Sequence, residues 1–235
     1  MKLVWMMAGA AVMSGCAGSM GGPGPVVYSM VAVDAGQAAA EATAAQIGPA
    51  QADFALVVAP GDSAWFTRLA AATGLAVSGP AMADRMGLAF LSNLEVLGDT
   101  SIVIGTGDAA FTMQDALYQA SDQRRYLDLM LVNLPAGVNV DGAIRALLEY
   151  MATDVMADAS VVLGVRAATV ADANRVETML RAAFMNAVEC GGMDGAQRTY
   201  RIFFGPSART RCTTAQPLPG PADAITARVS VGLHS

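Results

Sequence analysis

The residue types that most often carry acid–base and nucleophilic chemistry are sparse in this chain. His234 is the only histidine among 235 residues, and it lies next to the last one. This argues against a Ser–His–Asp triad, a Cys–His pair and the two-histidine zinc motif of metalloproteases. The aspartates and glutamates are scattered, and no spacing forces two of them together. The sequence therefore gives no independent indication of general acid–base catalysis.

The three cysteines, Cys16, Cys190 and Cys212, form no C-x-x-C motif. Neither a zinc site nor a thioredoxin-like motif is therefore indicated. Cys190 and Cys212 could form a disulfide if the chain were exported, whereas in the cytoplasm both would be buried or free thiols.

Composition bounds the class of protein. Hydrophobic residues make up 54% of the chain, and 235 residues can build one large domain or two small ones. The net charge is −6, the only lysine is Lys2, and no basic cluster is larger than Arg124–Arg125. This is not the electrostatic footprint of a DNA- or RNA-binding protein, so nucleic acid is not an expected partner.

Apolar strands and helices alternate through the first half. Val26–Val33 and Asp53–Ala59 are apolar runs typical of buried strands, and Gln37–Gln46 between them is alanine-rich and free of helix breakers. Further expected elements are a helix capped by Asp62 or Ser63 and ending before Gly74, the strands Leu75–Val77 and Ile102–Ile104, and a helix over Met82–Leu91. This alternation predicts a doubly wound α/β sheet, in which ligands bind beyond the carboxyl ends of the strands.

The second half holds one ambiguous stretch. Met113–Leu134 fits a helical face, yet Leu129–Val132 could be a strand. The other expected elements are the helices Asp141–Met156 and Val170–Val188, the strands Val161–Val165, Arg198–Phe204 and Ile225–Leu233, and a proline-rich loop over Pro206–Pro221.

Six segments resemble, in order, motifs of FtsZ, the bacterial relative of tubulin. Gly137–Leu148 is similar to the N-x-D-x-x-D loop and following helix with which one subunit reaches into the nucleotide site of its neighbour. The other five are Asp99–Ile104, Asp115–Asp122, Asn174–Ala183, Met193–Ala196 and Ala227–Leu233. The resemblance implies a nucleotide-binding α/β domain over residues 1–112, a long connecting helix over 113–134 and a smaller α/β domain over 135–235.

The resemblance also implies a GTP site with Mg²⁺, but in a degenerate form. Phosphates need backbone N–H groups from a glycine-rich turn, and this chain offers Gly9 in the first turn and Gly61, Asp62 and Ser63 in a later one. Asp62 would repel the phosphates. Asp122 takes the place of the acid that reads the guanine edge, although it also fits a solvated helix aspartate.

The loop that would enter a neighbouring subunit keeps Asn139 and Asp141, and Arg145 follows them. Asp141 stands in the place of the first catalytic acid, although it also fits a helix N-cap. Ile144 replaces the second acid, and isoleucine cannot polarise an attacking water. The resemblance therefore implies weak or absent GTP hydrolysis and an end-to-end contact with a second copy or with an FtsZ filament.

Residues 1–16 have two interpretations. Lys2, the apolar run Leu3–Met13 and Cys16 resemble a bacterial lipoprotein signal, in which Cys16 would be lipidated. Alternatively, Lys2–Met7 is a buried first strand, which in the FtsZ family lies in the middle of the sheet. The first interpretation predicts an outer-membrane lipoprotein with a non-enzymatic α/β interaction domain at the periplasmic face. The second predicts a cytoplasmic FtsZ-like protein, either degenerate or an active GTPase with unusual loops.

Overall fold

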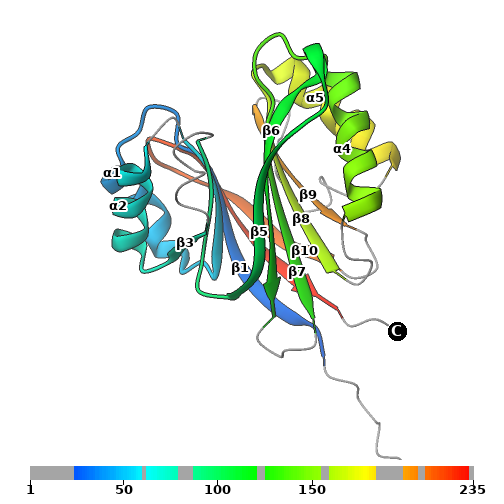
Figure 1. The fold of residues 1–235 in the computed structure, drawn as a ribbon. Helices are drawn as coiled ribbons and strands as arrows, with labels where there is room; N and C mark the ends of the chain where they lie inside the picture. The colour runs from blue at the N-terminus through cyan, green and yellow to red at the C-terminus, as the bar shows by residue number, and fades with distance from the viewer. Residues whose placement is uncertain are drawn as a thin grey trace, which may run out of the picture.

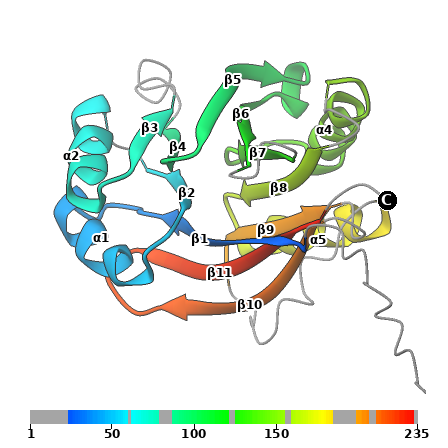
Figure 2. The ribbon, with the colours of Figure 1, turned by 90° about the horizontal axis from the view of Figure 1, so that it is seen from below.

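Two β-sheets pack face to face, and helices cover the outer face of each (Figures 1 and 2). The computed structural model describes residues 24–59, 62–78, 87–120, 125–154, 159–183, 198–205 and 210–232. Helices α1 and α2 lie on one side and α4 and α5 on the other. The result is a four-layer α/β/β/α sandwich, the arrangement expected when two sheets each have two apolar faces to bury.

The six-stranded sheet has the order β10-β11-β1-β2-β4-β3, and β1 with β2 is its one parallel pair among the described residues. Its strands are β1 (Val26–Asp34), β2 (Phe54–Val58), β3 (Ala76–Ser78), β4 (Leu88–Ser92), β10 (Thr210–Leu218) and β11 (Asp223–Val231). It is covered by α1 (Ala40–Ile47), the short 3₁₀ turn η1 (Gly48–Ala50) and α2 (Ser63–Thr73).

The five-stranded sheet has the order β5-β6-β7-β8-β9, and β7 with β8 is parallel. Its strands are β5 (Glu95–Ile104), β6 (Phe111–Gln119), β7 (Tyr126–Asn133), β8 (Ala159–Arg166) and β9 (Tyr200–Gly205). It is covered by α4 (Val140–Asp154) and α5 (Val170–Ala183), with the 3₁₀ turn η2 (Gly107–Ala109) between β5 and β6.

The sequence predicts the elements of the described residues between 24 and 78 well. Helix α2 begins where the Asp62 carboxylate accepts a hydrogen bond of 2.9 Å from the backbone N–H of Trp65. It ends at Gly74, whose φ of 75° is the left-handed conformation that closes helices. Strands β1 and β2 are parallel and buried, as their continuous apolar runs predict.

Other predictions are wrong, and the doubly wound sheet with a long connecting helix is one of them. Met113–Leu134 forms the antiparallel strands β6 and β7 within its described residues instead of a helix. Leu88–Leu91, the described end of the predicted helix Met82–Leu91, belongs to β4. The predicted loop Pro206–Pro221 contains β10.

Strands from both ends of the chain meet in one sheet. β11 pairs with β1 along nine residues from Val26 to Asp34, so the C-terminal part of the chain completes the sheet that the N-terminal part begins. Residues 1–16, on which the lipoprotein and first-strand interpretations rest, lie outside the described residues. Within the described ranges, no helix has the length and apolar character needed to cross a membrane.

A carboxyl pair lies under α4 on the helix-covered face of the five-stranded sheet. Asp128 on β7 is buried, and its carboxyl group shares a hydrogen bond with Asp115 on the neighbouring strand β6. Burial, followed by the hydrogen bond and the charge of Asp115, raises the pKa of Asp128 to about 9. The Tyr150 hydroxyl of α4 donates to the Asp115 carboxylate over 2.7 Å. Asp128 is therefore protonated at neutral pH, which places a single negative charge in the pair.

This carboxyl pair predicts a pH-dependent stability. Between the pKa of an unfolded aspartate, about 4, and the folded value of about 9, the native state holds a proton that the unfolded state has lost. Stability then falls as pH rises through this window, by at most about 1.4 kcal/mol per pH unit. We expect Asp128→Asn to remove most of this slope in urea denaturation series between about pH 5 and about pH 9.

Asp108→Asn is the matched control because Asp108 is an exposed aspartate, so the same substitution is made without burial. Asp108→Asn should keep the wild-type slope. If Asp128→Asn keeps it as well, Asp128 is not the buried acid that causes the pH dependence.

Candidate functional site

Charged side chains gather at one end of the sandwich, where strands of both sheets terminate. Asp34 ends β1, and Arg166 ends β8 of the other sheet. The Arg166 Nε donates to Asp34 Oδ2 over 3.3 Å, so this ion pair joins the two sheets. Asp223 begins β11 and pairs with Arg198, which lies two residues before β9. We call these four residues the arginine–aspartate cluster.

The register of the six-stranded sheet explains why the two aspartates lie together. β1 and β11 are antiparallel, and Asp34 is the direct cross-strand partner of Asp223. Two like charges in such positions repel each other. The pKa of Asp223 is raised by burial and by Asp34, while Arg198 acts in the opposite direction. The two arginines thus compensate a repulsion that the strand pairing creates.

Tyr200, the first residue of β9, forms the floor beneath the cluster. Its ring is fully buried between the sheets, and its hydroxyl donates to the Leu56 carbonyl over 3.4 Å. Burial raises the pKa of Tyr200 well above its ordinary value, with further contributions from Asp34 and Asp223. Tyr200 therefore stays a neutral phenol and acts as a positioning residue, not as a base.

A third arginine supports the cluster from the side of α5. Arg201 is 4% exposed, and its guanidinium group donates to Glu177 Oε2 over 3.2 Å and to Asn174 Oδ1 over 2.8 Å. It also donates to the Arg198 carbonyl, which fixes the backbone that carries Arg198. Because its donors are used internally, Arg201 holds the site in place and is poorly placed to meet a ligand.

The donor set of the cluster suits an anion better than a divalent cation. Among the described residues, no group of three or more His, Cys, Asp or Glu side chains could hold a metal ion. Each of the two aspartates is engaged by an arginine. By contrast, the side chains of Arg166 and Arg198 are 34% and 23% exposed, which leaves guanidinium N–H groups within reach of solvent. Planar guanidinium groups match the oxygens of carboxylates and phosphates.

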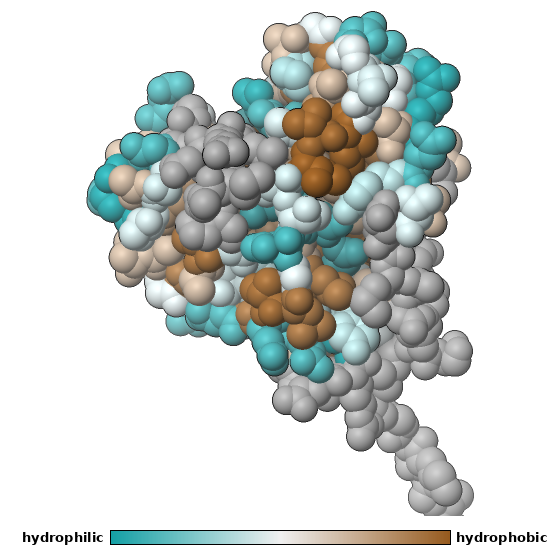
Figure 3. Space-filling model, in the orientation of Figure 1, coloured by the Kyte–Doolittle hydropathy of each residue, from teal (hydrophilic) through white to brown (hydrophobic). Residues whose placement is uncertain are grey.

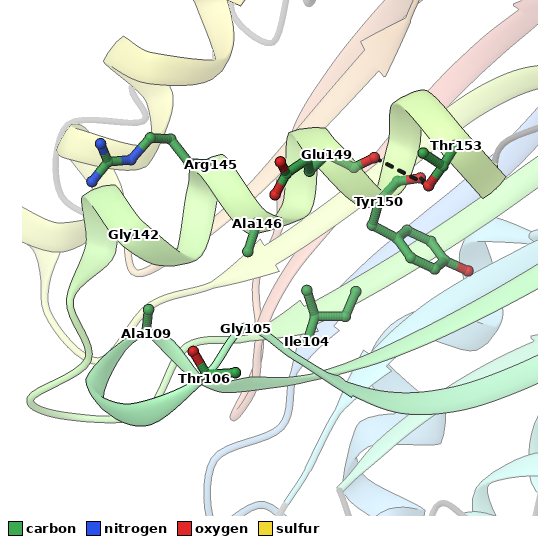
Figure 4. A pocket seen from close by; sticks show the side chains of 10 residues that line it. All are labelled: Ile104, Gly105, Thr106, Ala109, Gly142, Arg145, Ala146, Glu149, Tyr150 and Thr153. Carbon is green, nitrogen blue, oxygen red and sulfur yellow. Dashed lines mark hydrogen bonds between the residues drawn. The ribbon is translucent and has the colours of Figure 1, made fainter.

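A groove lies beside α4, away from the arginine–aspartate cluster (Figure 4). This groove has a volume of about 520 Å³ and runs between the exposed side of α4 and the end of β5. Its lining consists of Ile104, Gly105, Thr106, Ala109, Gly142, Arg145, Ala146, Glu149, Tyr150 and Thr153. Thr153 donates to backbone carbonyls of its own helix, and Tyr150 donates to Asp115 below the groove. The hydroxyl groups of Thr153 and Tyr150 therefore stabilise the fold, and the groove is too open and shallow to enclose a small molecule.

The residues predicted from the sequence do not converge on the arginine–aspartate cluster. The Asn139 carboxamide accepts a hydrogen bond from Gly142 N over 3.1 Å and so caps α4. Asp141 forms a bidentate ion pair with Arg175 of α5, which lowers the pKa of Asp141. Arg145 lines the groove and donates to the Asp141 carbonyl.

The predicted nucleotide-binding residues are spread more widely. Asp62 caps α2, and Ser63 is the first residue of that helix on the outer side of the six-stranded sheet. Gly9, Gly61 and Asp122 lie outside the described residues. Nucleotide binding at these positions stays a prediction.

None of the four cluster residues is among the site residues predicted from the sequence, although two of them carry a usable signal. Asp34 and Arg166 are the charged residues that follow directly on the predicted buried strands Val26–Val33 and Val161–Val165. Charged groups at the carboxyl ends of strands mark the edge at which α/β proteins bind ligands. Nothing in the local sequence of Arg198 or Asp223 indicates that they join the same site, because the cross-strand register brings them there.

Comparison with solved structures places the fold among endonuclease/exonuclease/phosphatase proteins. Such a protein from Bacteroides vulgatus superimposes with a TM-score of 0.68 at 10% identity, over 88% of this chain and 99% of the other. The human Nocturnin catalytic domain, solved with a bound sulfate anion, gives 0.66 at 12% identity, over 88% and 94%. A mannosyl-6-phosphatase from Bacteroides thetaiotaomicron gives 0.61 at 8% identity, over 86% and 99%.

No protein-family model matches the sequence, and no curated protein sequence does. The structural likeness, at identities near 10%, shows the fold and leaves the chemistry to the residues of this chain. It also corrects the resemblance to FtsZ and tubulin. One of the short sequence matches, Asp115–Asp122, falls on strand β6 within its described residues, where that family has a helix. A filament-forming GTPase is therefore the wrong family, and the lipoprotein alternative finds no support.

The packing of Tyr200 leaves no room for a side chain at Gly164 on β8. A Cβ at Gly164 would lie 2.6 Å from the Tyr200 hydroxyl oxygen and 2.9 Å from a Leu131 methyl carbon. Gly164→Ala should therefore lower the free energy of unfolding by about 1–3 kcal/mol, the usual effect of overpacking. Gly48→Ala is the control, because no atom lies within 4 Å of the added Cβ and its φ is helical. Equal urea midpoints for the two variants would contradict this account of Tyr200.

Proposed function

We propose that this protein binds a small phosphate ester at the arginine–aspartate cluster, through the guanidinium groups of Arg166 and Arg198. The observation that carries the proposal is the pairing of two partly exposed arginines with two aspartates at the common end of both sheets. Hydrogen bonds between guanidinium groups and phosphate oxygens are charge-assisted and frequently bidentate.

Preorganisation supports this proposal. Arg166 is held by Asp34, Arg198 by Asp223, and the Arg198 carbonyl by Arg201. Arginine side chains that are already ordered lose less conformational entropy when a ligand binds. The fold neighbours support the class of ligand, since one holds a sulfate anion and another is a mannosyl-6-phosphatase.

The net charge of the chain and the balance of charges at the cluster favour a small phosphate ester over a nucleic acid as the ligand. The chain has a net charge of −6, and the three arginines at this end are balanced by Asp34, Asp223 and Glu177. A long polyanion binds through many phosphate contacts on a basic surface, whereas a single phosphate group needs two or three well-placed donors. A sugar phosphate or a mononucleotide fits the cluster better than DNA or RNA.

Hydrolysis of the bound ester is the second candidate function, and the activities of the fold neighbours are the observation that favours it. The described residues supply little for it. Both aspartates are engaged by arginines, Tyr200 stays protonated, and His234 lies outside the described residues. Efficient hydrolysis requires a positioned general base or a metal-activated water. We therefore expect binding with slow or no turnover.

A disulfide on β10 bears on the compartment in which the protein works. Cys212 is disulfide-bonded, and its partner lies outside the described residues. Disulfides persist in oxidising compartments and are rare in the cytoplasm. We propose that the chain works in an oxidising compartment, which differs from the cytoplasmic one of the two locations expected from the sequence. Peptide mapping without reductant that finds Cys212 as a free thiol in protein from its native cells would contradict this.

Titration calorimetry with inorganic phosphate and mannose 6-phosphate tests the proposed function. Arg166→Gln and Arg198→Gln should each weaken binding about tenfold or more, since a hydrogen bond to a charged group contributes about 1.5–3 kcal/mol. Arg68→Gln is the matched control, because Arg68 forms an exposed ion pair with Glu41 on the helices over the six-stranded sheet. Circular dichroism checks that each variant is folded.

Arg166→Lys separates loss of binding from loss of fold, because it keeps the charge beside Asp34 but removes the planar fork. We expect it to restore the thermal stability lost in Arg166→Gln and to restore binding only in part. Wild-type protein that binds neither ligand, or binds them with the same affinity as both glutamine variants, refutes the proposal. Release of phosphate at about 1 s⁻¹ or faster would instead favour the hydrolase.

A further inference from the structure

Strand β5 is an unusually exposed sheet edge. It is ten residues long and ends the five-stranded sheet, and no other described strand pairs with its outer side. Val96, Leu97 and Val103 are 42%, 46% and 64% exposed. Figure 3 shows apolar surface gathered in two places along the region where β5 runs in Figure 1. A long apolar edge with unpaired N–H and C=O groups is a template for pairing with another strand.

In the described part of the chain, the other three sheet edges have features that prevent pairing with another strand. β3 has only three residues, and β10 contains Pro217 and a bulge between Cys212 and Thr214. β9 is buried along its whole length and lies against β10 of the other sheet. These are the usual means by which native sheets protect an edge.

β5 lacks these protective features over most of its length. Its bulge falls between Val96 and Gly98, which leaves the seven residues Gly98–Ile104 regular. This segment contains no proline, lysine or arginine, and Asp99 is its one charge. An edge that the described strands leave unpaired, beside three edges that are protected, indicates a partner.

We propose that β5 pairs antiparallel with β5 of a second copy of this chain, which joins the two five-stranded sheets into one. The distribution of residues along the strand favours this partner. Polar Asp99, Thr100 and Ser101 lie in the middle, with exposed apolar residues towards both ends. An antiparallel partner with the same sequence then matches apolar ends to apolar ends and the polar middle to itself.

Charge selects the register of this pair. A two-fold axis at Asp99 would place two aspartates directly opposite each other, which is destabilising. An axis at Thr100 places Thr100 opposite its own copy and Asp99 opposite Ser101, and it brings Val103 next to Leu97 of the second copy. Threonine pairs and aspartate–serine hydrogen bonds are favourable in sheets. We therefore place the axis at Thr100.

The groove beside α4 gives the second copy a further contact. Ile104, Gly105 and Thr106 at the end of β5 form its lower wall, and α4 forms its upper wall (Figure 4). Ile102 also packs against the core beneath α4. A strand added beside β5 extends this lower wall, so side chains of the second copy meet Arg145 and Glu149. Because the contact involves mainly one strand of each copy, we expect it to bury less surface than a standard interface and to give a reversible dimer that depends on concentration.

Analytical ultracentrifugation of Val103→Lys and Val27→Lys tests the proposal. Val103→Lys puts a charge on the proposed interface and should weaken dimerisation about tenfold or more. Val27→Lys is the matched control, because Val27 is a valine of β1, 50% exposed, on the helix-bearing face of the other sheet. It should dimerise like the wild type. Wild-type protein that stays monomeric at the highest attainable concentration overturns the proposal, as does equal dimerisation of both variants.

Thr100→Cys tests the register. Cα atoms directly opposite each other in an antiparallel pair lie about 4.5–5.5 Å apart, within the range of a disulfide. Under mild oxidation Thr100→Cys should give a covalent dimer on non-reducing gels, whereas Val27→Cys and the wild type should not. A dimer that forms in the ultracentrifuge but leaves Thr100→Cys uncrosslinked would refute this register. Val103→Lys that fails to fold by circular dichroism would leave this crosslink as the deciding measurement.

Discussion

The apolar layer between the two sheets is the constraint on which the rest of the structure depends. Its polar atoms meet at a few places, such as the 2.7 Å contact between the hydroxyls of Ser78 and Tyr118. Charges cannot enter such a layer without a large desolvation cost. They are therefore displaced either to the ends of the strands, as in the arginine–aspartate cluster, or to the helix-covered face, where Asp128 remains protonated. The position of the candidate site follows from this exclusion.

The sequence predicts elements well where one physical signal dominates. β1, α1, β2 and α2 follow one another as apolar strand and alanine-rich or capped helix, and the parallel pairing of β1 with β2 follows from that order. The same reasoning fails for β6 and β7. Leu127, Leu129 and Leu131 face the other sheet, while Met130 and Val132 face α4 and α5. A strand buried on both faces loses its period of two, so its residues also fit a helical stripe.

The candidate site is less predictable than the fold because its parts come from four separate strands or their approaches. A charged residue after a buried strand identifies Asp34 and Arg166 as edge residues. The meeting of Asp34 with Asp223 depends on the register between β1 and β11, which are nearly two hundred residues apart in the sequence. β10 is likewise hard to predict from its local sequence. Pro217 suggests a loop, but proline is tolerated on an edge strand, and the edge position is a property of the whole sheet.

The near-neutrality of the arginine–aspartate cluster decides what it can do. An arginine pair without acids would attract anions strongly but would repel itself in the unliganded protein. Here Asp34 and Asp223 stabilise the pair and also compete with a ligand for the same guanidinium donors. A phosphate must then bind to the N–H groups that the aspartates leave free, or displace an aspartate at a cost. Burial and Asp34 raise the pKa of Asp223, whereas Arg198 lowers it. The competition for Arg198 therefore depends on the balance between the burial of this carboxyl group and its ion pair. Such a site is suited to modest, selective affinity for a compact anion.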